Sequence, residues 1–174
     1  GAELHLTPAE KTIEYSRVYA QELAQKKGYL LLNQFDNPDN WKAHYKTTGP
    51  EIWQDTAGEI THFVSAMGTT GTIMGTSTYL KEKDKAIQIV GVQPTDNSSI
   101  PGIRKWPEAY LPKIFDAKKV DRIMEVSEEE ARFMAKKLAK EEGIFSGMSS
   151  GGAATVALRL AQELDYGVIV SIVC

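Results

Sequence analysis

A short run of glycines and threonines is the feature of this sequence with the clearest chemical potential. It consists of Gly68, Thr69, Thr70, Gly71 and Thr72, and it separates an apolar segment from a helical pattern. Glycines let the chain turn so tightly that several backbone N–H groups converge. The following helix adds its positive dipole end, and threonine hydroxyls add neutral donors. The run predicts a phosphate or carboxylate site that needs no lysine, and a plain tight connection explains its spacing equally well.

This first glycine loop (residues 68–72) lacks the spacing of the two common nucleotide-binding loops. No Gly-Lys-Ser/Thr follows it, as in a Walker A loop, and the GxGxxG fingerprint is absent. A second glycine loop (residues 146–152) contains Ser149 and again precedes a helical pattern. Alone it favours a serine N-cap with glycines for close packing. The presence of two such loops favours a ligand site over a plain connection, because ligands of open α/β sheets bind where loops of this kind lie close together.

Other reactive side chains form no competing pattern. His5, His44 and His62 are dispersed without the spacing of metal ligands, so a structural role is the stronger interpretation for each. No Gly-x-Ser-x-Gly elbow is present. Cys174 lies in an apolar run that offers nothing to stabilise a thiolate. We therefore predict no metal site and no cysteine nucleophile.

The segments around the two loops alternate between strand and helix patterns. Strands are predicted over residues 29–32, 60–67, 87–92, 123–126 and 168–173. Helices are predicted to begin at capping boxes that start at Thr7, Thr48 and Ser127, and further helices follow the two glycine loops. Residues 93–112 form a long irregular segment of a kind that is often functional. The alternation predicts an α/β fold with a mostly parallel sheet covered by helices.

Composition places the chain among ordinary globular proteins. Its 174 residues are 42% hydrophobic and 25% charged, which is enough for one domain with a core. The net charge of -3 and the lack of a dense basic run argue against nucleic acid and anionic membranes as partners. The apolar runs are too short for a membrane span. A single cysteine is compatible with the cytoplasmic location that we expect.

At the two glycine loops the chain resembles the cysteine synthases, or O-acetylserine sulfhydrylases, which are fold-type II pyridoxal-phosphate enzymes. The resemblance covers essentially the whole chain, including residues 33–38, 48–53, 98–104, 142–145 and 147–151. The Thr69–Thr70 pair and the Ser-Ser-Ile-Pro-Gly-Ile-Arg segment are similar to the B-type enzyme, which also accepts thiosulfate. The resemblance implies pyridoxal 5'-phosphate as cofactor and cysteine formation from O-acetylserine and sulfide or thiosulfate.

The resemblance also implies roles for individual residues. Residues 68–72 would hold the cofactor phosphate, and Ser149 would face the pyridine nitrogen. Gln34 would help to bind the substrate carboxylate, while Gly102 and Ile103 would border the active-site entrance. A neutral serine cannot keep the pyridine nitrogen protonated as an aspartate would. That suits elimination of acetate followed by addition of sulfide, with the cofactor supplying the difficult electronics.

The chain departs from the family's pattern at the catalytic lysine. The family's Schiff-base lysine lies upstream, in a Gly-Ser-x-Lys-Asp-Arg-like segment that is absent here. No catalytic residue is therefore assigned, and this chain alone is expected to be inactive. Both ends are expected to be cuts, since the chain lacks an initiator methionine and stops inside an apolar run. Residues 1–39 are expected to be the tail of the family's smaller domain, and residues 40–174 most of its larger, cofactor-binding domain.

Two alternatives accompany this hypothesis. One is a related fold-type II enzyme, either a dehydratase or a cystathionine synthase, and the B-type segments argue against it. The other is a catalytically dead remnant that binds phosphate esters. For the intact enzyme the resemblance implies a homodimer that acts on small molecules.

Overall fold

The computed structural model describes all residues from 1 to 174, and they form two compact units, Gly1–Gln34 and Phe35–Cys174. The first unit contains a 3-10 turn, η1 (Ala9–Lys11), and the helix α1 (Thr12–Lys27), which ends at Gly28 in the left-handed conformation. The predicted capping box at Thr7 does not form, because the Thr7 hydroxyl lies 2.6 Å from the Ser16 hydroxyl instead.

The predicted strand over residues 29–32 is wrong. These residues adopt no regular secondary structure, and Leu30 is 88% exposed. A strand needs a neighbouring strand to satisfy its N–H and C=O groups, and the first unit contains no strand for it to pair with. The apolar residues of this segment therefore resemble a strand in composition but do not form the hydrogen bonds of one.

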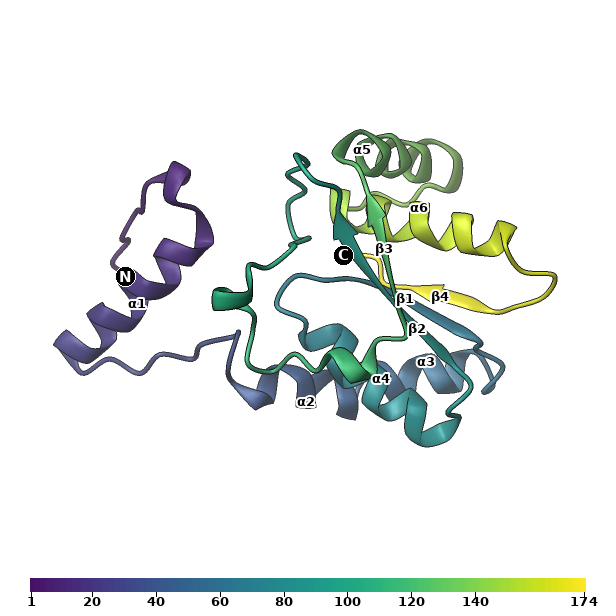
Figure 1. Ribbon diagram of the computed structural model, residues 1–174, viewed down its shortest axis with the longest axis horizontal. Helices are drawn as coiled ribbons and strands as arrows, with labels where there is room; N and C mark the ends of the chain where they lie inside the picture. The colour runs from purple at the N-terminus through teal and green to yellow at the C-terminus, as the bar shows by residue number, and fades with distance from the viewer. The chain divides into compact units, whose positions relative to one another are not determined.

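The second unit is built on a four-stranded parallel sheet. Its strands are β1 (His62–Ala66), β2 (Gln88–Pro94), β3 (Arg122–Val126) and β4 (Ile169–Ser171), in the order β3-β2-β1-β4 (Figure 1). The register places Val64 opposite Val90 across the β1–β2 pair. The other four predicted strands are thus confirmed, with ends that differ by a few residues. The predicted α/β class with a parallel sheet is confirmed as well.

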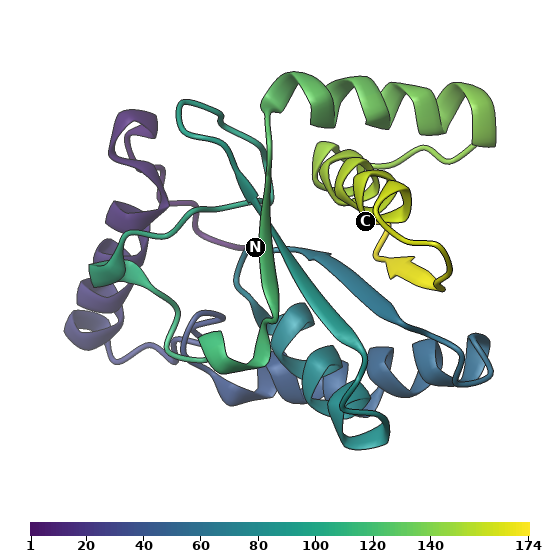
Figure 2. The same ribbon diagram turned by 45° about the vertical axis from the view of Figure 1, so that its right-hand side comes forward.

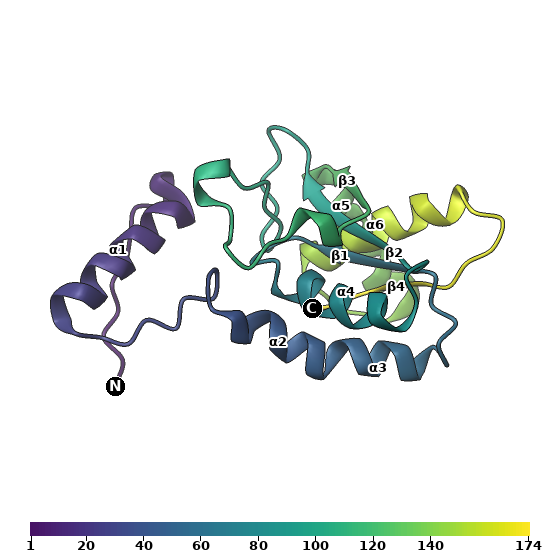
Figure 3. The same cartoon turned by 60° about the horizontal axis from the view of Figure 1, so that its bottom comes forward.

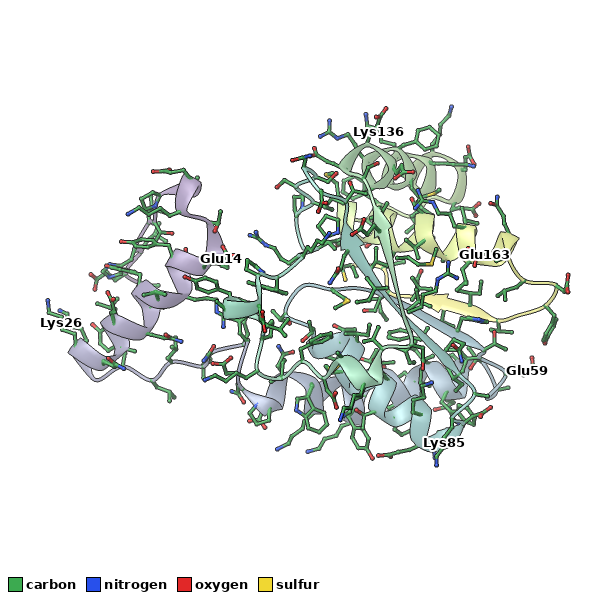
Figure 4. The ribbon with its side chains drawn as sticks, viewed as in Figure 1. Glu14, Lys26, Glu59, Lys85, Lys136 and Glu163 are labelled. Atoms are coloured by element: carbon green, nitrogen blue, oxygen red, sulfur yellow. The ribbon has the colours of Figure 1, made fainter.

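Helices cover both faces of this sheet. One face carries α2 (Pro38–Lys46), α3 (Thr48–Asp55) and α4 (Gly71–Lys83), and the other carries α5 (Glu128–Lys137) and α6 (Met148–Gln162), as Figures 1 and 2 show. Figure 3 shows α2 and α3 following one another along the same side of α4. Charged side chains such as Lys85 and Lys136 point away from the sheet (Figure 4).

The core consists of two apolar clusters, one on each face of the sheet. Phe63 and its neighbour across the β1–β2 pair, Ile89, pack with Ile73 of α4 in one cluster. The adjacent residue Val64 faces the other cluster, with Val156 of α6. This follows from the alternation of side chains along a strand. Each fully buried side chain of this size stabilises the fold by about 1.5–3 kcal/mol.

The helix ends follow the sequence signals only in part. Ser127 and Glu130 form the predicted capping box at the start of α5. The box predicted at Thr48 does not form, because α2 ends only two residues earlier and Thr48 already lies inside α3. Its hydroxyl contacts Nδ1 of His44 at 2.9 Å instead. α2 itself begins at Pro38, with Asn37 as its N-cap.

The remaining connections are short helical turns. Residues between β2 and β3 include η2 (Glu108–Tyr110) and η3 (Ala117–Lys119), in agreement with the predicted irregular segment. α5 continues as a π-helical turn (Leu138–Glu142) that ends at Gly143 in the left-handed conformation. None of the helices combines the length and the apolar composition that a membrane-spanning segment requires.

Candidate functional site

The first glycine loop follows β1, an inner strand of the sheet, and opens directly into α4. Thr70 is the N-cap of α4 and has φ 71°, in the left-handed region. A threonine held there costs about 1–3 kcal/mol, and such strain persists mainly at functional sites. α4 has no hydrogen bond from its N-cap side chain, although its first N–H, that of Gly71, donates to Oγ1 of Thr69 at 3.4 Å. Its free N–H groups and its positive dipole end therefore offer a place for an anion.

The three threonine hydroxyls of this loop differ in their surroundings. Thr70 is only 3% exposed, and its Oγ1 has no hydrogen-bond partner. Oγ1 of Thr69 accepts a hydrogen bond from Nδ2 of Asn40 at 3.1 Å. Oγ1 of Thr72 lies 3.3 Å from Nε2 of His44. A buried hydroxyl without a partner costs stability in the free protein, so the Thr70 hydroxyl fits a position where a ligand supplies the partner.

His44 connects the first glycine loop to α3. Its Nδ1 lies 2.9 Å from the Thr48 hydroxyl, and its Nε2 faces Thr72. Burial lowers the pKa of this imidazole below its ordinary value of 6.5. At neutral pH the ring is therefore uncharged, with one nitrogen donating and the other accepting. The sequence predicted a structural role for His44 but did not indicate its contact with Thr72.

Asn40 and His44 are the site residues that sequence reasoning did not find. They lie four residues apart on α2 and therefore on the same helical face. Gly71 and Gly75 have the same spacing on α4. Two polar residues and two glycines with matching spacing are the signal that could have indicated a close contact between these helices.

The glycines of α4 allow that contact. A Cβ at Gly71 would lie 1.8 Å from Oδ1 of Asn40, and a Cβ at Gly75 would lie 2.1 Å from the Trp41 carbonyl oxygen. Backbone atoms of α2 leave no room for a side chain at position 75, and a side chain at position 71 would displace the Asn40 amide. α2 therefore approaches closely enough for its polar side chains to reach the first glycine loop.

The segment after β2 packs against the same loop. The indole Nε1 of Trp106 donates to the Gly68 carbonyl at 2.7 Å. A Cβ at Gly68 would lie 2.7 Å from the carbonyl oxygen of Gly102. Gly102 has φ 87°, and a Cβ there would lie 3.2 Å from Cβ of Ser149. The structure thus brings Gly68, Gly102 and Ser149 together, although they come from three separate parts of the chain.

The two glycine loops meet at a small cavity of about 40 Å³. Its lining consists of Ser65, Ala66, Thr72, Ser149, Ser150, Ile172 and Cys174. The two serines of the second loop are not equivalent. Oγ of Ser150 accepts from the backbone N–H of Cys174 at 2.8 Å, whereas the Ser149 hydroxyl makes no hydrogen bond within the chain. Ser149 is therefore the serine that is available to a ligand.

The remaining predicted site residues lie elsewhere. The side chain of Ile103 is 1% exposed and belongs to the core cluster on the α5–α6 face. Its backbone, with that of Gly102, contributes to a groove of about 520 Å³ lined by residues 94–105. Gln34 belongs to the first unit, so its predicted contact with a substrate carboxylate stays a prediction, as does the border role of Gly102 and Ile103.

These features define an α/β protein in which an inner parallel strand leads through a glycine loop into a helix without an N-cap side-chain hydrogen bond, the kind of position where anions bind in other α/β proteins. The chain belongs to the family described as pyridoxal-phosphate dependent enzyme, which matches residues 1–174. Cysteine synthase B of Pseudomonas aeruginosa is 56% identical over 174 residues, and that of Escherichia coli strain K12 is 53% identical. Both alignments cover 100% of this chain. They span 58% and 57% of the relatives' own lengths.

Solved structures show the same fold. An O-acetylserine sulfhydrylase isoform from Entamoeba histolytica superimposes with a TM-score of 0.84 at 35% identity, over 99% of this chain and 54% of that one. An O-ureido-L-serine synthase gives a TM-score of 0.88 at 32% identity, over 97% and 56% of the two chains. The chain thus spans little more than half the length of the relatives it matches.

The residues present fit the cofactor of this family. A phosphate group needs several donors and tolerates no bulk close to the backbone. The first glycine loop offers a helix N-terminus without an N-cap side-chain hydrogen bond, a buried hydroxyl without a partner on Thr70, and a glycine at position 71 against which the Asn40 amide packs. These groups suit the 5'-phosphate of pyridoxal phosphate, and the free hydroxyl of Ser149 suits a ring nitrogen.

Proposed function

We propose that this chain is the cofactor-binding part of a B-type cysteine synthase, which forms cysteine from O-acetylserine and sulfide or thiosulfate. The observation that carries the proposal is the convergence of the two glycine loops on one cavity, with Ser149 unpaired beside it. The similarity to the two cysteine synthases named above, over the whole chain, supports the same function.

The chemistry begins with placement of the cofactor. Pyridoxal phosphate, when bound, supplies the electron withdrawal that lets acetate leave the β-carbon of O-acetylserine and sulfur take its place. The first glycine loop holds the phosphate through the N–H groups of α4 and the hydroxyls of Thr69, Thr70 and Thr72. These donors are neutral and fixed before binding, so the loop needs no rearrangement to accept the anion.

Ser149 sets the protonation of the ring. It lies in the first turn of α6, where the dipole of the helix is positive. A positive helix end disfavours an additional proton, and a serine hydroxyl carries no charge that could hold one. Ser149 would donate its hydroxyl hydrogen to the ring nitrogen and would leave that nitrogen without a proton of its own. This weakens electron withdrawal and favours elimination and addition over reactions that need a longer-lived carbanion.

This chain supplies fewer groups for the substrate than for the cofactor. Gln34 would bind the substrate carboxylate, and the backbone around Gly102 and Ile103 would border the approach to the ring. No lysine lines the cavity where the two glycine loops meet, and we assign a catalytic role to no residue of this chain. Cysteine formation is proposed for the intact protein.

A second candidate function is binding of phosphate esters without turnover. The observation that favours it is the completeness of the first glycine loop within one compact unit, beside a cavity lining that contains no lysine. This candidate predicts saturable binding of pyridoxal phosphate with no covalent attachment to the protein.

Titration of the purified protein with pyridoxal phosphate and with pyridoxal, followed by borohydride reduction and peptide mass spectrometry, tests both candidates. We expect pyridoxal phosphate to bind at least about tenfold more tightly, since pyridoxal lacks the phosphate contacts. Attachment to one lysine of this chain would contradict the statement that it holds no catalytic residue. Equal binding of the two compounds would exclude the phosphate site. Incubation of the intact protein with O-acetylserine and sulfide then separates cysteine formation from binding alone, and other products would indicate a related enzyme.

We also propose that the intact protein is a cytoplasmic homodimer. Support comes from exposed apolar side chains on the α5–α6 face, where Phe133 is 65%, Phe145 is 97% and Leu158 is 51% exposed. Exposed apolar side chains of this size are typical of interaction surfaces. Light scattering coupled to size-exclusion chromatography measures the mass directly, and a monomer at all concentrations would contradict the dimer.

A further inference from the structure

We propose that Asn40 is a positioning residue that fixes the hydroxyl of Thr69 as a hydrogen-bond donor toward the phosphate. The inference rests on the proposed phosphate site and concerns how that site selects its ligand. Asn40 belongs to α2 and Thr69 to the first glycine loop, 29 residues further along the chain.

The Thr69 hydroxyl has a limited capacity for hydrogen bonds. A threonine hydroxyl has one hydrogen to donate and two lone pairs that accept. Nδ2 of Asn40 donates to Oγ1 of Thr69 at 3.1 Å, and the backbone N–H of Gly71 donates to the same oxygen at 3.4 Å. Both lone pairs are therefore occupied. The only remaining capacity of Thr69 is its hydrogen, for which the chain provides no acceptor.

The position of Asn40 is itself determined by packing. Its Oδ1 lies where a Cβ of residue 71 would be, at 1.8 Å from the ideal position. Glycine at position 71 therefore lets the amide lie flat against the start of α4, with Nδ2 toward Thr69. Asn40 is half-buried and lies on a helix that packs along α4. These contacts hold the amide in place before any ligand arrives.

This arrangement defines the ligand chemistry. A hydroxyl that can only donate favours an oxygen that can only accept, and the oxygens of a phosphate dianion are of that kind. A singly protonated phosphate presents one P–OH group that needs an acceptor, which Thr69 cannot offer. The site should therefore prefer the dianion, which predominates above the second pKa of a phosphate ester, about 6.

A double-mutant cycle on binding of pyridoxal phosphate tests the inference. Asn40→Ala frees one lone pair of Thr69, so its hydroxyl can rotate, and we expect affinity to fall about three- to tenfold. Thr69→Val removes the donor and should cost about tenfold. If Asn40 acts through Thr69, the double variant binds no more weakly than Thr69→Val alone. Losses of binding free energy that add in this cycle would overturn the inference.

A second cycle supplies the matched control. Thr72 belongs to the same loop but contacts His44 rather than Asn40, so losses from Asn40→Ala and Thr72→Val should multiply. Non-additivity with Thr72 equal to that with Thr69 would show a general loosening of the loop and would overturn the specific role. Denaturant unfolding of each variant confirms folding, and Asn40→Leu, which keeps the volume, replaces the alanine variant if that fails to fold.

The pH profile gives a readout that a purely structural role would not move. For wild-type protein, affinity for pyridoxal phosphate should rise between pH 5 and pH 7.5 as the phosphate loses its second proton, near pH 6. With Asn40→Ala the Thr69 oxygen can accept from a P–OH group, so the ratio of variant to wild-type dissociation constants should be larger at pH 7.5. The ratio cancels the titration of the ligand's own ring. A ratio that does not change with pH would overturn the inference.

Two outcomes distinguish failure of the proposed phosphate site from failure of the role of Asn40. If wild-type protein binds neither pyridoxal phosphate nor inorganic phosphate, the proposed function fails and the inference fails with it. If the wild type binds pyridoxal phosphate and Asn40→Ala binds it equally well, only the role of Asn40 fails.

Discussion

Two buried threonines illustrate how single residues contribute to this protein. Thr76 of α4 is fully buried, and its Oγ1 has no hydrogen-bond partner. Thr155 of α6 is also buried, but its hydroxyl donates to the Gly151 carbonyl at 2.9 Å. A buried hydroxyl without a partner costs the free energy of removing it from water, whereas a paired one recovers that cost.

Thr76→Val and Thr155→Val should therefore change stability in opposite directions. Valine keeps the branched shape and removes only the hydroxyl. We expect Thr76→Val to raise the free energy of unfolding by about 1 kcal/mol and Thr155→Val to lower it by about 1 kcal/mol. Urea unfolding followed by circular dichroism measures both, and equal losses in the two variants would contradict the assignment of Thr76 as unpaired.

His44 predicts a specific dependence of stability on pH. Burial lowers its pKa below 6.5, so the folded protein binds fewer protons at this ring than the unfolded chain does. Its contribution is complete above pH 6.5 and is lost as the pH falls below that value, because the unfolded state gains a proton first. His62, whose pKa burial also lowers, acts in the same direction.

The unfolding free energy of wild-type protein should accordingly fall more between pH 7.5 and pH 5.5 than that of His44→Asn. Asparagine removes the titrating group and keeps a polar side chain next to Thr48. Urea titrations at the two pH values measure the difference. An identical pH dependence in the two proteins would show that His44 titrates alike in the folded and unfolded states.

At the scale of elements, the contact between α2 and α4 determines the geometry of the first glycine loop. The two helices meet where α4 presents Gly71 and Gly75, and a Cβ at Gly75 would also lie 2.7 Å from Cβ of His44. Helices that approach this closely place polar side chains within reach of neighbouring loops. The contact therefore supports the loop from outside the sheet.

Gly75→Ala should separate these helices and weaken both stability and ligand binding. Overpacking of this kind costs about 1–3 kcal/mol, and the same displacement would move Asn40 and His44 away from the loop. Gly147→Ala is the control for the unfolding measurement, because a Cβ there would meet nothing closer than 3.7 Å. Denaturant unfolding and titration with pyridoxal phosphate measure the two effects. Equal behaviour of the two variants would mean that α2 can shift without consequence.

At the scale of the whole molecule, the two compact units differ in how many residues they contribute to the apolar core. Both apolar clusters, with the side chains packed against them, consist only of residues after position 34. The two glycine loops and all four strands lie in the second unit. The residues that we propose to bind the phosphate therefore all belong to that unit.

Deletion of residues 1–34 should leave the second unit folded and able to bind pyridoxal phosphate. We expect one cooperative unfolding transition and a dissociation constant within about threefold of that of the full chain, a difference of less than 1 kcal/mol. Circular dichroism and calorimetric titration check this expectation. Loss of the transition would show that the first unit is required for the fold of the second.

The order of the main elements and the positions of the two glycine loops could be predicted from the sequence. These signals are local, because side-chain periodicity, the Ser127 capping box and a glycine loop before a helix each depend on neighbouring residues. Local signals also produced the errors. Residues 29–32 have a strand-like composition but no partner strand, and Thr48 has the pattern of an N-cap in a place where a preceding helix leaves no room for one.

Only the tertiary structure decided which side chains support the site. Asn40 and Thr69 lie 29 residues apart and are brought together by the packing of α2 on α4, which no local pattern encodes. The difference between Ser149 and Ser150 is likewise tertiary, because Cys174, from a distant part of the chain, pairs with Ser150. Contacts across such separations arise from the burial of apolar faces in the folded core, so they become visible only once that core is formed.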